Sequence, residues 1–142
     1  MAKKKVYVSF DRDTDTRFRL QLEAWDPNPG FEFAFSNIPL DKSRSQSVEA
    51  IKTVLARTID EATYTLVVLG KHINRTHKLA AGIGYVNWQH FEIAKSKEHK
   101  NRLVGVQIDE ANPSPCGPLD DADTTWAAGF ERDAVIDALI GA

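Results

Sequence analysis

Trp88 and Glu92 are the two residues whose types and spacing best suit a chemical reaction. They stand four residues apart in the run YVNWQHFEIA, so a helix places the indole and the carboxylate on one face. A carboxylate beside an aromatic plane suits a ligand in which a flat heterocycle is joined to a ribose. Such a carboxylate can bind ribose hydroxyls and stabilise the oxocarbenium-like charge of a breaking N-glycosidic bond. The spacing is equally compatible with a tryptophan in the core and a solvated glutamate.

Other polar side chains offer weaker sites. His72 and His77 lack a His-x-x-x-His spacing and an evident third ligand, so no metal site is expected. His90 and His99 are expected on the solvent side of their helix, without a chemical role. Ser9 has no Gly-x-Ser-x-Gly elbow, and the sequence places no histidine and carboxylate next to it. A hydrolytic triad is therefore not expected.

Strand and helix patterns alternate along the chain. The apolar run at 64–69 is typical of a strand buried on both faces, at the centre of a parallel sheet. Residues 71–84 are expected to form a long loop that has room for a short turn, and residues after 109 an irregular, Pro-rich segment. The remaining strands are predicted at 6–10, 31–35 and 103–108, and the helices from 11 to about 25, from 48 to 62, from 85 to 97 and from 130 to 140.

This alternation predicts an α/β fold with a central, mainly parallel sheet and helices on both sides. We expect one domain over residues 1–142, in which 1–108 form the core and 109–142 an irregular segment and a C-terminal helix. Ligands of such sheets bind beyond the carboxyl ends of the strands. The expected rim carries Ser9, Phe10, Asp11, Ser36, Asn37, residues 70–72 and the helix of Trp88.

Several functions common on this architecture lack their motifs. The sequence contains neither Gly-x-Gly-x-x-Gly after the first strand nor Gly-x-x-x-x-Gly-Lys-Ser/Thr. Asp11 and its neighbours do not suit a flavin phosphate loop, and Gly70 stands where a receiver domain needs an aspartate. Asp11 and Asp13 are more often solvated turn and cap residues, although Asp11 lies at the expected ligand rim.

Composition and charge exclude further classes. The net charge is -2 and no segment is strongly basic, so no nucleic-acid partner is expected. The lysines at 3–5 precede an apolar run too short for a signal peptide or a membrane span. We expect a cytoplasmic protein without a membrane partner. The single cysteine, Cys116, makes no internal disulfide.

Three pieces of the chain resemble TIR-like domains, in particular the TIR-like subunit of bacterial Thoeris antiphage systems. Residues 5–10 (KVYVSF) open the sheet and residues 65–70 (TLVVLG) lie at its centre. The third piece is Trp88-x-x-x-Glu92-Ile93, followed at the family's spacing by residues 103–106 (LVGV). The resemblance covers residues 4–108.

The resemblance implies a flavodoxin-like domain that cleaves NAD at the nicotinamide–ribose bond, with NAD as substrate and no cofactor. The product would be a cyclised or otherwise modified ADP-ribose that activates a separate effector protein during infection. A phage-derived trigger and self-association are further expectations from the family. Nicotinamide leaves as a neutral molecule from a pyridinium, so one carboxylate can suffice without a general acid.

Carried over by position, the resemblance implies that Glu92 is the catalytic carboxylate. Phe10 and Asp11 would line the pocket, Ser36 and Asn37 would border it, and Trp88 and Phe91 would pack around the substrate or hold the helix of Glu92. A second register puts Gln89 in the place of the glutamate and makes the site inactive. The distance to the strand at 103–108 favours Glu92.

Two other functions stay open at this point. One is a catalytically silent TIR-like scaffold that works through protein contacts or by binding a nucleotide. The other is an N-glycosidic enzyme of similar fold that acts on nucleosides.

Overall fold

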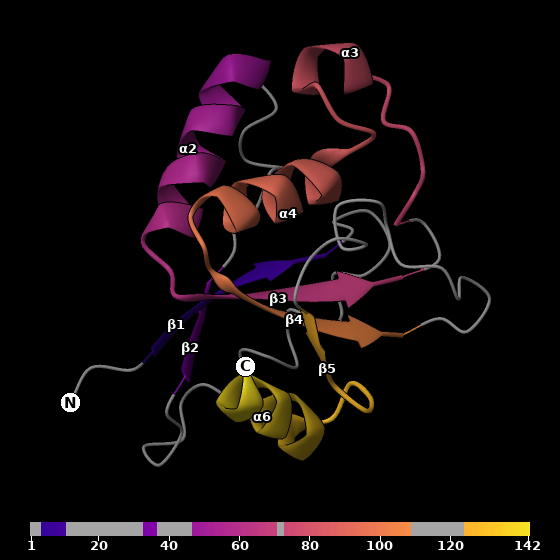
Figure 1. Ribbon diagram of the computed structural model, residues 1–142. Helices are drawn as coiled ribbons and strands as arrows, with labels where there is room; N and C mark the ends of the chain where they lie inside the picture. Colours follow the sequence, from indigo (N-terminus) through magenta and orange to yellow (C-terminus); the bar gives the residue numbers. More distant parts are fainter. Residues whose placement is uncertain (1–3, 11–32, 37–46, 71–72, 109–123) are drawn as a thin grey trace.

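The computed structural model describes residues 4–10, 33–36, 47–70, 73–108 and 124–142, which form a sheet covered by helices on both faces (Figure 1). The helices α2, α3 and α4 lie on one face, and α6 lies on the other. The elements are β1 (Lys4–Ser9), β2 (Phe33–Ser36), α2 (Val48–Asp60), β3 (Tyr64–Leu69), α3 (Ala80–Ile83), α4 (Trp88–Glu98), β4 (Arg102–Gln107), β5 (Thr124–Trp126) and α6 (Arg132–Gly141).

The sheet has the strand order β2-β1-β3-β4-β5, and each neighbouring pair is parallel. From β1 the chain moves outward to β2 and then returns to β3 on the other side of β1. The order therefore reverses between β1 and β3, which is the topological switch point of a flavodoxin-like sheet. This arrangement confirms the predicted α/β fold with a parallel sheet.

The alternation of side chains along the strands produces two faces with separate cores. Val6 and Val8 of β1 face α6, where Val135 and Leu139 complete a cluster with residues of β3 and β4. Tyr7 points to the other face, into a cluster with residues of α2, α3 and α4. Every side chain of β3 is buried, as its apolar run predicts.

Two short elements differ from the predictions. A four-residue helix, α3, lies in the segment expected to be a loop, and it ends at Gly84, whose φ of 84° favours glycine. The strand β5 lies in the segment expected to be irregular, beside β4. The ring of Trp126 in β5 packs closely on Gly105 of β4. A Cβ atom at Gly105 would lie only 2.7 Å from this ring. The helix predicted from residue 11 to about 25 lies outside the described residues.

Asn87 begins α4 and also ties that helix to the segment before it. Its Oδ1 accepts a hydrogen bond from the backbone N–H of His90 at 3.0 Å, which is an N-cap. Its Nδ2 donates to the carbonyls of Ile73, at 2.8 Å, and Arg75, at 3.0 Å. One side chain thus satisfies three backbone groups.

Replacing Asn87 should cost more than replacing an ordinary cap. We expect Asn87→Ala to lower the free energy of unfolding by about 2–3 kcal/mol, because a cap and two further hydrogen bonds are lost. The matched control is Ser47→Ala, which removes only the cap of α2, a bond from Ala50 N at 3.2 Å, and should cost about 1 kcal/mol. Urea denaturation measures both. Equal losses would show that the bonds to Ile73 and Arg75 contribute nothing.

Candidate active site

The candidate site lies at the switch point, where β1 and β3 stop pairing. Their register ends at Ser9 and Val67, whereas β3 stays paired with β4 as far as Leu69 and Gln107. Ser9 is therefore the last paired residue of β1 on the edge where ligands bind in this fold.

The first half of α4 crosses this region and is fastened to both strands. The Nε2 of Gln89 donates a hydrogen bond to the carbonyl of Val68 in β3 at 3.0 Å. One turn later, Glu92 is bound by side chains of β1. A main-chain carbonyl of β3 and two side chains of β1 thus fix the position of α4 over the switch point.

Glu92 lies in a polar contact that joins α4 to β1. The hydroxyl of Ser9 donates to Oε1 at 2.8 Å, and the hydroxyl of Tyr7 donates to Oε2. The side chain of Glu92 is 0% exposed. The interpretation of Glu92 as a solvated residue is therefore wrong, and a carboxylate does stand beside Ser9. The alternation of Tyr7 and Ser9 on one face of a strand was the available sequence signal.

Trp88 and Phe91 pack in the layer between α2, α4 and the sheet. Their rings meet edge to face with centroids 5.7 Å apart, and both are buried. They share a hydrophobic cluster with Tyr7, whose hydroxyl reaches Glu92, and with Leu55 of α2. The two aromatic rings therefore hold the helix that carries the carboxylate.

Comparison with known protein families gives one decisive match. Residues 7–113 of the 142 match the model of a family described as Thoeris protein ThsB, TIR-like domain. The chain belongs to this family. A search of curated proteins finds no match.

Membership of the ThsB TIR-like family confirms the resemblance and the flavodoxin-like α/β fold. It gives the chain a role in antiphage defence signalling, together with other Thoeris components. TIR-like domains are often associated with NAD cleavage. The matched range contains the last three residues of β1, the switch point and the whole of α4.

Only two of the other four residues predicted for the ThsB TIR-like site lie within the described residues. Phe10 is buried in the cluster on the α6 face of the sheet, opposite to Glu92. Ser36 ends β2, in register with Tyr7 of β1. Asp11 and Asn37 lie outside the described residues. A role of these four residues in substrate binding stays a prediction.

His90 is buried in this ThsB-family domain, which corrects the expectation that it faces solvent. Its Nε2 lies 3.1 Å from the carbonyl of Ile73 and 3.1 Å from Oδ1 of Asn74. Because both partners are acceptors, Nε2 carries the proton of the neutral ring. Burial lowers the pKa of His90 from 6.5, and the hydrogen bond to Ile73 opposes this only in part. His99 is exposed, as predicted, and lies 3.0 Å from Asp60.

The lowered pKa of His90 predicts a loss of stability in acid. Above pH 6.5 the histidine is neutral in both folded and unfolded chains; below it, the unfolded chain binds a proton that the folded chain does not. As the pH decreases below 6.5, the free energy of unfolding should therefore decrease, and His90 contributes at most about 1.4 kcal/mol per pH unit to this loss. His90→Gln retains an amide donor at this position but cannot take up a proton. Between pH 7 and pH 5 its urea midpoint should therefore fall less than that of the wild type. Equal falls in the two urea midpoints would contradict this.

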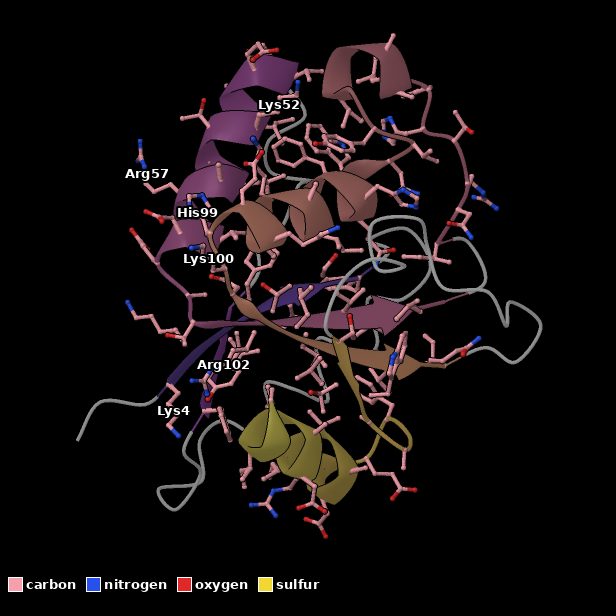
Figure 2. The ribbon with its side chains drawn as sticks, in the orientation of Figure 1. Lys4, Lys52, Arg57, His99, Lys100 and Arg102 are labelled. Carbon is pink, nitrogen blue, oxygen red and sulfur yellow. The ribbon has the colours of Figure 1, made fainter. Side chains whose placement is uncertain are left out.

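Two grooves of the described surface are lined by residues other than Glu92. One, of about 480 Å³, is lined by residues of α2 and α4 that include Phe91 and by Tyr85. Another, of about 680 Å³, lies at the amino ends of the strands, where Figure 2 shows Lys100 and Arg102. Neither groove is lined by Glu92. In the described part of the ThsB-family fold, the carboxylate is thus closed off.

The described residues contain neither a candidate metal site nor a membrane-spanning helix. No cluster of three or more His, Cys, Asp or Glu side chains there could hold a metal ion. Among the same residues, no helix has the length and hydropathy needed to cross a membrane.

Proposed function

We propose that this chain cleaves NAD at the nicotinamide–ribose bond, with Glu92 as the catalytic carboxylate. The observation that carries the proposal is the position of Glu92. Its carboxylate lies at the β1/β3 switch point, held by hydroxyls of β1, on a helix inside the range that the family model matches. In flavodoxin-like folds, ligands bind at this switch point.

The reaction needs little from the protein beyond a well-placed negative charge. The bond between C1′ of the ribose and the pyridinium nitrogen breaks, and its electron pair leaves with neutral nicotinamide. Positive charge develops on the ribose, where a carboxylate in a dry site stabilises it strongly. Water, or a nucleophilic atom of the same ADP-ribose, then attacks C1′ and loses a proton. The product is an ADP-ribose or a cyclised form of it, which a separate effector protein senses.

Burial of the carboxylate imposes a condition on this reaction. Because Glu92 is 0% exposed, the ribose can reach it only after covering groups move aside. We infer that NAD enters between the ends of β1 and β3 and that α4 keeps its anchor on Val68 through Gln89. When the covering groups close again over the bound NAD, they would exclude water from the reacting bond.

The test is mass spectrometry of small molecules from bacteria that express the chain, sampled during phage challenge. Cells with the wild-type chain should lose NAD and gain nicotinamide and an ADP-ribose-type nucleotide. Cells with the Glu92→Gln chain should gain neither. Equal nucleotide levels in the two cultures would contradict the proposal.

One observation favours the second candidate, a catalytically silent TIR-like module. Both carboxylate oxygens of Glu92 already accept hydrogen bonds inside the fold, so the residue could serve only to bind α4 to β1. In that case Glu92→Gln would lower stability, and phage challenge would produce no nucleotide from either chain. Defence would then depend on protein contacts that survive the substitution.

A further inference from the structure

Glu92 carries a carboxylate that has lost all contact with solvent, and such a group keeps its negative charge only when donors or positive charges replace its water. The hydroxyl of Ser9 donates to one oxygen and the hydroxyl of Tyr7 to the other. Hydrogen bonds from a hydroxyl to an ionised carboxylate are roughly twice as strong as neutral ones. The pair thus holds both oxygens of the carboxylate in place.

The two donors come from a rigid part of the fold. Tyr7 and Ser9 alternate on one face of β1, whose backbone is paired with β2 and β3 on its two sides. The ring of Tyr7 is wholly buried in the cluster that contains Trp88. Neither hydroxyl can follow a displaced carboxylate far, so the two donors also set the direction in which the carboxylate points.

From this geometry we infer that Tyr7 and Ser9 are positioning residues that hold the carboxylate of Glu92 in its orientation for catalysis. The inference rests on the proposed function, because it concerns the carboxylate of the NAD reaction. Neither residue touches the substrate in this role; each acts through Glu92. Loss of either hydroxyl should leave the carboxylate less well aligned.

Other charged groups near this part of α4 stay unchanged when the hydroxyls are removed. Lys52 of α2 and Lys95 of α4 lie over the ring of Phe91, at 5.9 and 5.6 Å from its centroid. Lys52 pairs with Glu49 at 3.7 Å, and Lys95 pairs with Glu98 at 3.0 Å. On the same helix, His90 bonds to the segment before α4, and β3 faces α4 with the neutral Thr65.

The test follows the carboxyl carbon of Glu92 by NMR in the full chain labelled with 13C-glutamate. The signal is assigned by its absence in Glu92→Gln. In Ser9→Ala and in Tyr7→Phe the chemical shift of this carbon at pH 7 should move away from its wild-type value, because each substitution removes a hydrogen bond to the carboxylate. The matched control is Ser96→Ala, which removes a hydroxyl that donates at 2.8 Å to the main-chain oxygen of Glu92. If both variants keep the wild-type chemical shift, as the control should, the inference is overturned.

Turnover of NAD supplies the second measurement. Both variants should lose about tenfold in kcat with KM changed less than about threefold. Ser96→Ala should keep the wild-type kcat. If the wild-type chain releases no nicotinamide, the proposed function fails, whereas the NMR chemical shifts still decide whether the hydroxyls hold the carboxylate. A tenfold loss of kcat in Ser96→Ala would also overturn the inference.

Discussion

Glu92→Gln should abolish nicotinamide release while the fold persists. The substitution keeps the shape of the side chain but removes the negative charge that stabilises the ribose cation. Because a preorganised charge in a dry site acts mainly on the transition state, we expect kcat to fall about 10³-fold or more. Nicotinamide released from NAD by the purified, active chain measures the effect, and circular dichroism reports the fold.

The matched control for this substitution is Glu98→Gln, on the same helix. Glu98 is exposed and pairs with Lys95 at the surface, at 3.0 Å. Exposed pairs of this kind contribute little, so its turnover and stability should stay close to those of the wild type. Wild-type turnover in Glu92→Gln would rule out Glu92 as the catalytic carboxylate. Retained turnover would also favour the alternative alignment with the family, in which Gln89 takes the place of the catalytic glutamate.

Trp88→Ala should produce the largest loss of stability. Trp88 is 8% exposed and fills the space between α2, α4 and the sheet, where it packs edge to face on Phe91. Truncation removes most of the buried surface of an indole and leaves a cavity that rigid neighbours fill only in part. We expect the free energy of unfolding to fall by about 3–5 kcal/mol. Urea denaturation provides the measurement.

Trp126→Ala is the control, because Trp126 is 46% exposed and should cost much less. If Trp88→Ala does not fold, Trp88→Phe retains a ring in the cluster and should cost about 1–2 kcal/mol, still with a measurable transition. A loss from Trp88→Ala no larger than that from Trp126→Ala would show that the aromatic cluster does not hold α4 in place.

Local patterns predicted most of the described fold. The apolar run of β3 predicted a central buried strand, and the alternation of strands and helices predicted the parallel sheet. Both features can be predicted from the order of apolar and polar residues within each segment, without knowledge of the rest of the chain. The three residues of β5 are too few to show a period, and they form a strand only because β4 offers an unpaired edge beside them.

The pattern failed where an element is buried on more than one side. His90 was expected on the solvent side of an amphipathic helix, yet residues 88–93 of α4 are all buried. The sheet, α2 and the segment tied down by Asn87 enclose that half of the helix from different directions. A sequence period describes one buried face, so it cannot show that a second neighbour covers the opposite face.

The family, the α/β fold and the Trp-x-x-x-Glu pair at helical spacing can be recognised in the sequence alone. The surroundings of the carboxylate depend on the tertiary structure. Tyr7 and Ser9 precede Glu92 by 85 and 83 residues, and they meet it because α4 crosses the switch point next to β1. Contacts over such separations depend on how the sheet is ordered and how the helix packs on it, and no local pattern of residues records either.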